Sequence, residues 1–328
     1  MKQIPDRTKW TYIRFALACA FCVLQVAAQT PSGPKVELSL IVTDKANKPV
    51  NTITKDEIQV KEGKVEQVVL SVEHDDRPID YGLVMDASKS LMKLSAAALE
   101  AARLIIANKR PDDEIFIEQF ISSDKIIRVE DFTSDGNALM ESLKTIKLDG
   151  GQSAVIDGIY MGAEHVAKHN KKSEGRRRKA LIVITDGEDR LSFYKEEQLI
   201  KLLREEGIQV FALGLVLDLD RDGGFIRISP RDKAEKLLNT VADETGGRAF
   251  FPRDKKELIE ATAQMINHVR AQFRITYQST SVPLKKGFHK VDVKLIAPSD
   301  EKRKAIVPRG YFVAPKDVPA KAKEQKSS

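Results

Sequence analysis

The middle of the chain alternates short apolar runs with longer amphipathic stretches. Residues 81–85 and 180–184 are short apolar runs, which is typical of strands buried on both faces of a sheet; the second strand is predicted to extend to Thr185. Further strands are predicted at 114–121, 125–130, 208–215 and 248–251, and helices at 90–108, 137–146, 153–168, 194–206, 233–245 and 255–271. This alternation predicts a doubly wound, Rossmann-like α/β domain with a mainly parallel sheet, spanning residues 78–272.

Both flanks of this domain have the period of strands instead. Residues 36–42 alternate apolar and polar positions, and Gly63-Lys64 has the composition of a hairpin turn. The other strand-like stretches are 57–60, 65–72, 273–277, 290–296 and 310–313. Neither flank can bury an apolar face alone. We therefore predict that 29–77 and 273–315 pair as one small β sandwich; the alternative is two separate β units.

The two ends of the chain have their own composition. Residues 1–28 combine basic residues, an apolar block at 15–23 and the small residues Ala27 and Ala28, which is the pattern of a cleaved secretory signal. An uncleaved anchor is the alternative, although the apolar block is shorter than a membrane-spanning helix requires. Residues 316–328 are charged and polar and predict a disordered tail.

Removal of the signal would change the cysteine content and the net charge of the chain. Cys19 and Cys22 both lie within it, so the mature protein would have no disulfide and no thiolate. The net charge would fall from +6 to +3, because the signal carries four basic residues and one acidic residue. A nearly balanced charge argues against nucleic acid as a partner. Cleavage would also leave no membrane span.

Three oxygen-bearing side chains follow the buried strand at 81–85. Asp86, Ser88 and Ser90 occupy alternating positions before the first predicted helix. In a doubly wound sheet, ligands bind at the carboxyl ends of the strands. One carboxylate and two hydroxyls suit Mg²⁺ or a similar hard cation and suit Zn²⁺ poorly. The sequence therefore predicts a metal site at this edge.

This D-x-S-x-S motif resembles the metal-ion-dependent adhesion site of the von Willebrand factor type A family. Residues 150–157, GGQSAVID, resemble the family's loop with a threonine ligand, and 180–189, ALIVITDGED, resemble its strand with a second aspartate. The resemblance covers about 78–272, and residues 42–64 resemble the segment ahead of this domain in bacterial secreted relatives. It implies Mg²⁺, or Mn²⁺ or Ca²⁺, bound by Asp86, Ser88, Ser90, Ser153 and Asp186.

The resemblance also implies a function. In the family, the cation keeps a position open for an acidic side chain of a partner protein. The expectation is an exported, periplasmic or extracellular protein of the cell envelope that binds a protein partner in a metal-dependent way. Three positions depart from the family pattern: Lys89 replaces a glycine, Leu91 replaces a methionine, and Ser153 replaces the threonine. Lys89 supplies no ligand; it either weakens metal binding by repulsion or adds a contact to an acidic partner.

Other interpretations of these residues are supported by fewer features of the sequence. The serines and aspartates could simply cap helices, and the domain could be an assembly subunit with a structural metal. A phosphohydrolase would need a second aspartate at the position of Ser88. Because the chain lacks a G-x-S-x-G elbow, a Walker loop and a G-x-G-x-x-G loop, we predict that it is not an enzyme.

Other polar motifs favour structural roles. Asp218, Asp220 and Asp222 have the spacing that opens a calcium loop, but its twelfth position is Ser229, so a solvated acidic turn is favoured. The basic residues of 171–179 lack interleaved aromatic residues and predict a solvated loop. The histidines show no metal-ligand spacing with a carboxylate, and no H-E-x-x-H motif is present.

Overall fold

The computed structural model describes residues 33–147, 151–171, 176–219, 228–281, 285–296 and 302–314, apart from the side chains of Ser90 and Lys93. The predicted signal at 1–28 and the predicted tail at 316–328 lie outside the described residues. Within the described ranges, no helix combines the length and the apolar character needed to cross a lipid bilayer.

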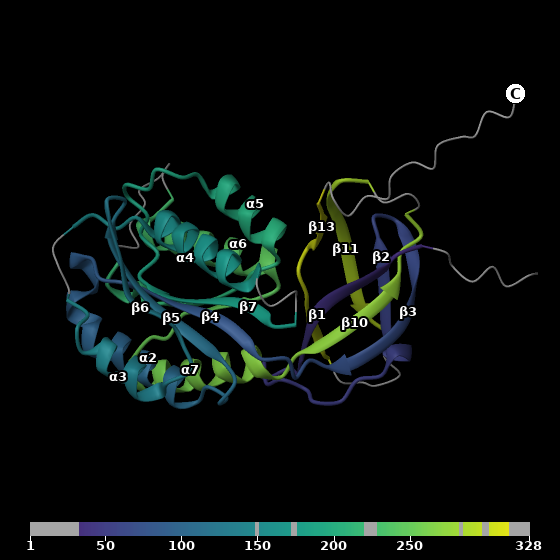
Figure 1. Cartoon of the computed structure of the whole chain (residues 1–328), viewed down its shortest axis with the longest axis horizontal. Helices are drawn as coiled ribbons and strands as arrows, with labels where there is room; N and C mark the ends of the chain where they lie inside the picture. The colour runs from purple at the N-terminus through teal and green to yellow at the C-terminus, as the bar shows by residue number, and fades with distance from the viewer. Residues whose placement is uncertain are drawn as a thin grey trace, which may run out of the picture. The chain divides into compact units, whose positions relative to one another are not determined.

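The central domain is built on a six-stranded sheet with the order β6-β5-β4-β7-β8-β9 (Figure 1). Its strands are β4 (Ile79–Asp86), β5 (Glu114–Ser122), β6 (Lys125–Thr133), β7 (Arg178–Thr185), β8 (Gln209–Gly214) and β9 (Arg248–Phe250). All neighbouring strands are parallel except β5 and β6. The predicted mainly parallel sheet is confirmed, and each predicted strand of this domain overlaps an observed one.

Helices cover both faces of this sheet (Figure 1). One layer consists of α2 (Ser95–Ala107), α3 (Gly136–Leu143) and α7 (Lys255–Arg270), and the other of α4 (Val155–Asn170), α5 (Glu196–Glu206) and α6 (Pro230–Thr245). A separate cluster of buried apolar side chains lies beneath each layer. Two cores on one sheet are the doubly wound arrangement that the alternation of strands and helices predicts.

The first predicted helix begins later than expected. The structure has a 3₁₀ helix, η2, at Lys89–Leu94, and the α-helix starts only at Ser95. Leu91 is fully buried in the core under α2, which holds this segment against the sheet edge. Short 3₁₀ segments are frequent at helix starts. The consequence is that Ser88 and Ser90 lie on a tight turn beside the strand end.

The flanking segments form a second, antiparallel sheet with the order β12-β1-β10-β3-β2-β11-β13. Its strands are β1 (Lys35–Thr43), β2 (Ile58–Glu62), β3 (Val65–His74), β10 (Phe273–Gln278), β11 (Gly287–Leu295), β12 (Lys304–Ile306) and β13 (Gly310–Val313). β10 lies between β1 and β3, and β11 pairs with β2. Strands from both sides of the central domain therefore share one sheet, and neither flank forms a sheet of its own.

This second sheet curls around a single core. β12, at one edge, contacts β11, near the other edge, and the enclosed core includes Leu40, Val60 and Tyr277. The seven strands follow one hydrogen-bonded order, whereas a sandwich would divide them between two sheets. The sequence did not indicate β12, because three residues are too few to show an alternating pattern.

A buried carboxylate holds four strands of this sheet together. Glu62, the last residue of β2, is 8% exposed. It accepts hydrogen bonds at 2.8–3.3 Å from Tyr277, Ser279, Ser281, His289 and Tyr311, which lie on or next to β10, β11 and β13. Burial opposes ionisation, but these hydrogen bonds outweigh burial and lower the pKa of Glu62. Five side-chain hydrogen-bond donors thus stabilise the ionised carboxylate.

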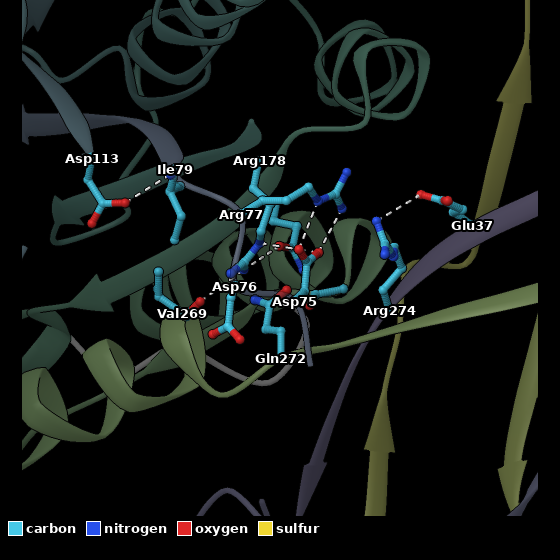
Figure 2. Close-up of polar contacts among 12 residues, drawn as sticks. Glu37, Asp75, Asp76, Arg77, Ile79, Asp113, Arg178, Val269, Gln272 and Arg274 are labelled. Atoms are coloured by element: carbon cyan, nitrogen blue, oxygen red, sulfur yellow. Dashed lines mark hydrogen bonds and ion pairs between the residues drawn. The ribbon is translucent and has the colours of Figure 1, made fainter. Parts of the chain in front are cut away.

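Charged side chains join the central domain to the second sheet where the chain passes between them (Figure 2). Asp75 accepts hydrogen bonds from Nε and Nη2 of Arg77, at 2.8 and 2.7 Å. Its Oδ2 lies 3.9 Å from Nε of Arg178, the first residue of β7. Arg178 Nη2 donates to the carbonyl of Val269 at the end of α7, at 2.9 Å, and Asp75 N donates to Gln272 O at 2.8 Å. Arg178, at the start of β7, therefore contacts both of the connections that link the two sheets: Asp75 in the one between β3 and β4, and Val269 where α7 leads into the one to β10.

Candidate metal centre

Three separate segments bring predicted ligands to the carboxyl edge of the central sheet. Asp86 is the last residue of β4, and Asp186 follows the last residue of β7. Ser153 lies two residues before the start of α4. Because β4 and β7 are parallel neighbours, their carboxyl ends lie side by side. The polar residues that the sequence placed after these strands are therefore neighbours in space.

Hydrogen bonds converge on the Asp86 carboxylate. Its Oδ1 accepts from the backbone N–H of Ser88 at 2.9 Å, and the Ser88 hydroxyl also contacts the carboxylate. Its Oδ2 accepts from Ser153 Oγ at 3.0 Å, across 67 residues of sequence. Three of the five predicted ligands, Asp86, Ser88 and Ser153, thus form one cluster, and all three side chains are at least 97% buried.

Sequence reasoning missed one member of this cluster, Thr185. Its Oγ1 donates to Asp86 Oδ2 at 2.7 Å and accepts from Gly187 N at 2.9 Å. The hydroxyl therefore positions the aspartate and also shapes the turn that follows β7. The available signal was a single hydroxyl residue at the end of an apolar run, directly before Asp186. From the sequence alone, Thr185 looks like any other buried strand residue, because its contact with Asp86 depends on the register of β4 against β7.

Asp86 differs from four other buried carboxylates, three of them in the central domain and one, Asp75, on the connection that precedes it. Burial raises its pKa, and the hydrogen bonds from Ser88, Thr185 and Ser153 only partly offset this effect. Within the described residues its partners are hydroxyls and a backbone amide, all of them neutral. The four others pair with arginines: Asp75 with Arg77, Asp80 with Arg177, Asp113 with Arg270, and Glu118 with Arg128. A cation beside Asp86 would supply the compensation that arginine supplies at these four sites.

Asp186 lies in the wall of a cleft next to this cluster. It is 3% exposed, and its Oδ1 accepts from the backbone N–H of Glu188 at 2.9 Å. The cleft has a volume of about 770 Å³, and its lining includes Ser153, Asp186 and the exposed side chain of Lys89. The side chain of Ser90, the remaining predicted ligand, lies outside the described part of the structure. The cleft therefore connects Ser153 and Asp186 to solvent.

The donor set fits a hard divalent cation. Two carboxylates and the hydroxyls of Ser88 and Ser153 offer oxygen atoms only, and the described segments hold no nitrogen or sulfur ligand beside Asp86. Mg²⁺ and Ca²⁺ prefer oxygen, whereas structural Zn²⁺ sites use cysteine and histidine. Lys89 lines the cleft without contacting the carboxylate of Asp86, so its charge does not replace a cation there.

Only the two ends of the acidic motif after β8 lie within the described residues. Asp218 ends a short 3₁₀ helix, and Asp220 and Asp222 lie outside the described residues. Ser229, at the twelfth position of the motif, is instead the N-cap of α6, and its Oγ accepts from Asp232 N at 3.1 Å. The position that would need a bidentate glutamate therefore has a structural role.

The basic loop and one histidine meet at the opposite edge of the sheet. The ligand atoms of Asp80, Glu114 and His169 lie within 4.8 Å of one another, a grouping that sequence spacing did not indicate. However, Asp80 already accepts from Arg177 Nε and, at 2.8 Å, from Asn170 Nδ2. The described basic residues Arg177 and Arg178 are thus used inside the fold, where they balance buried acids.

The fold and this cluster define the class of protein: a doubly wound α/β domain with a cluster of oxygen-bearing side chains at the carboxyl edge of its sheet. A family model described as the von Willebrand factor type A domain matches residues 83–264, more than half of the chain. The chain belongs to this family. The resemblance that the three motifs indicated is confirmed, and the matched range contains Asp86, Ser153 and Asp186.

Solved structures with a similar fold come from diverse sources. An aerotolerance-related membrane protein of Bacteroides fragilis is 22% identical, with 58% of this chain and 98% of that chain covered and a TM-score of 0.45. The pilus adhesin SpaC of Lactobacillus rhamnosus GG is 10% identical (82% and 48% covered, TM-score 0.46). Proximal thread matrix protein 1 of the mussel byssus, described with a zinc-occupied MIDAS motif, is 18% identical (62% and 48%, TM-score 0.45). No curated protein matches the chain. Sequence identities and TM-scores this low do not assign an activity to this chain.

Proposed function

We propose that this chain is an exported protein that binds another protein through a divalent cation, Mg²⁺ or in its place Mn²⁺ or Ca²⁺, held by Asp86, Ser88, Ser90, Ser153 and Asp186. Type A domains are protein-interaction modules in general, so this function agrees with the family. The proposal makes the chain a binding protein without catalytic residues. Export is inferred from the signal-like pattern of residues 1–28, with the cell envelope or its exterior as the destination.

The observation that carries this proposal is the convergence of neutral donors on Asp86. A buried carboxylate surrounded by hydroxyls 67 and 99 residues away is an expensive arrangement without a counter-charge. A divalent cation offsets that cost and uses the same oxygens as ligands. The adjacent cleft leaves room for one more ligand, and a carboxylate of a partner protein is suited to that position.

Thermal unfolding tests the metal site directly. The full chain is melted in EDTA and in excess Mg²⁺, beside Asp86→Ala. An ion present at about 100 times its Kd stabilises the folded state by about 2.7 kcal/mol. For a domain of this size, the melting temperature then rises by roughly 5–10 °C. Asp86→Ala should show no rise.

A matched control separates ligation from general electrostatics. Glu188 lines the same cleft but pairs with Arg190, with 2.6 Å between the charged atoms, and is not a proposed ligand. Glu188→Gln should therefore keep the Mg²⁺-dependent rise. Equal shifts in wild type and Asp86→Ala, or no shift in wild type, would contradict the metal assignment.

Partner capture tests the second half of the proposal. Immobilised protein is incubated with envelope extract in Mg²⁺, and bound proteins are compared with those retained in EDTA and by Asp86→Ala. A partner that disappears under both conditions supports metal-dependent binding. A partner that persists in EDTA indicates an assembly subunit that binds through another face. Turnover of a generic phosphoester, lost in Asp86→Ala, would instead indicate a phosphohydrolase.

A further inference from the structure

Two large apolar side chains next to the candidate metal centre are exposed to solvent. Phe193 is 78% exposed, more than any other large apolar side chain in the described residues, and Leu191 is 56% exposed. Both lie on the loop between β7 and α5, which we call the 187–194 loop. Exposed apolar groups of this size cost solubility and are often found where a partner binds. Their location beside a proposed binding site therefore needs an explanation.

The 187–194 loop is attached to the segment that carries a proposed ligand. The backbone N–H groups of Arg190 and Leu191 donate to the carbonyl of Ser153, at 2.9 and 3.3 Å. On its other side, the carbonyl of Leu191 accepts from Ser123 Oγ at 2.5 Å. Leu191 is therefore held directly against the backbone of Ser153, whose hydroxyl contacts Asp86.

A buried carboxylate fixes the backbone around Phe193. Asp157, 2% exposed in the first turn of α4, accepts from the N–H groups of Phe193 and Tyr194, both at 2.8 Å. The Tyr194 ring stacks on Tyr160, with 3.7 Å between ring centroids. The peptide on each side of the phenylalanine is anchored, while its ring projects away from the fold.

Asp189 adds a further anchor to the same loop. Its Oδ1 accepts from Ile156 N at 3.1 Å and from the hydroxyl of Ser192 at 2.5 Å, and Ser192 Oγ accepts from Asp157 N at 3.2 Å. Asp189 thus has a structural role in this loop. A loop held this firmly loses little conformational entropy on binding, which is the advantage of a preorganised contact surface.

We propose that Leu191 and Phe193 form the apolar part of the partner-binding face, and that the partner segment carries a large aliphatic or aromatic side chain within three residues of its metal-binding acid. This inference rests on the proposed function and specifies its partner. Continuity with the metal site supports it, since Leu191 touches the Ser153 backbone. The exposed Lys89 in the cleft favours the same acidic segment. Buried aromatic anchors commonly dominate protein–protein interfaces.

The test uses displayed peptides with a fixed central aspartate and three randomised positions on each side. Peptides are selected on the full-length chain in Mg²⁺, and the affinity of the best peptide is then measured by fluorescence anisotropy. We expect large aliphatic and aromatic residues to be enriched in the randomised positions. Leu191→Ser/Phe193→Ser should bind that peptide at least about ten-fold more weakly, because both substitutions remove apolar surface that the peptide would bury; a ten-fold change corresponds to about 1.4 kcal/mol.

Controls distinguish this inference from the proposed function. Ile259→Ser, on the exposed face of α7, removes a large apolar side chain that is 42% exposed and should leave peptide affinity unchanged. The double variant should keep the Mg²⁺-dependent thermal shift, since it removes no proposed ligand. If metal-dependent peptides are selected but bind the double variant equally well, this inference is overturned while the proposed function stands.

Two other outcomes would also overturn it. If no peptide binds in a metal-dependent way, the proposed function fails, and the inference that depends on it fails too. If the wild-type chain dimerises and the double variant is monomeric by light scattering, a second copy of this chain covers Leu191 and Phe193 instead of a foreign acidic segment.

Discussion

Two buried carboxylates, one in each sheet, differ in how far their hydrogen bonds offset the effect of burial on their pKa values. Glu62 in the second sheet and Asp86 in the central domain are 8% and 3% exposed. In both cases burial opposes ionisation. The hydrogen bonds around Glu62 overcome this effect and lower its pKa, whereas those around Asp86 do not, and its pKa is raised. The two groups have similar burial but opposite shifts.

The difference lies in the number and kind of donors. Glu62 receives five side-chain donors, and one of them is the imidazole of His289 at 3.0 Å. Asp86 receives hydroxyls and one amide. Glu62, which has enough hydrogen-bond donors to stabilise its charge, is a structural element. Asp86, which has only neutral partners and lies beside an accessible cleft, is suited to bind an added cation. The comparison explains why one buried acid is proposed as a ligand and the other is not.

Removal of the Glu62 carboxylate should have the largest effect. Glu62→Ala leaves several buried donors without an acceptor, and we expect a loss of about 3–5 kcal/mol in the free energy of unfolding. Urea denaturation of the full chain measures it, with and without Mg²⁺. The loss should be the same in both, because Glu62 lies in the other sheet. Glu66→Ala, an exposed acid on β3, is the control and should stay within about 0.5 kcal/mol of wild type.

Neutralising Asp86 should separate metal binding from folding. In EDTA, Asp86→Asn should unfold at the same temperature as wild type or higher, because an amide of equal size avoids burying a charge among neutral partners. In excess Mg²⁺ it should lack the gain of about 2.7 kcal/mol that wild type shows. Calorimetric melts under both conditions measure this. A strong loss of stability in EDTA would show that Asp86 is as structural as Glu62.

Thr185 should have a smaller effect on the same site. Thr185→Val removes the hydroxyl that donates to Asp86 Oδ2 and should weaken Mn²⁺ affinity by about ten-fold, as is common for groups that orient metal ligands. Isothermal titration measures the change. Thr185→Ser keeps the hydroxyl and should restore most of the affinity. An unchanged affinity in Thr185→Val would mean that Asp86 needs no orientation by β7.

Acid should weaken the contribution of Glu62 gradually. Because folding lowers its pKa, the ionised carboxylate stabilises the protein above its unfolded-state pKa near 4.5, and this stability is lost as the pH falls through the folded-state value. The groups that face it are His289, Tyr277 and Tyr311. The stability difference between wild type and Glu62→Gln should shrink between pH 6 and pH 3, by less than about 1.4 kcal/mol per pH unit. A difference independent of pH would contradict the assigned shift.

Much of the central domain was predictable because its signals are local. The apolar runs that became β4 and β7 are short and continuous, and the polar residues directly after them mark the strand ends. Parallel strands then bring Asp86 and Asp186 to one edge without further information. The start of α2 was not predictable in the same way, since the 3₁₀ turn before it depends on the burial of Leu91.

The remaining features arise from contacts that no local pattern encodes. Strand periodicity identified most flanking strands, but the insertion of β10 between β1 and β3 joins residues roughly 200 to 240 positions apart. The donors on Glu62 are up to 249 residues away, and Thr185 reaches Asp86 across 99. Chain order and residue type therefore determined the domain class and the candidate ligands. Strand register and burial, which are collective properties of the packed chain, decided which polar groups meet and left Phe193 exposed.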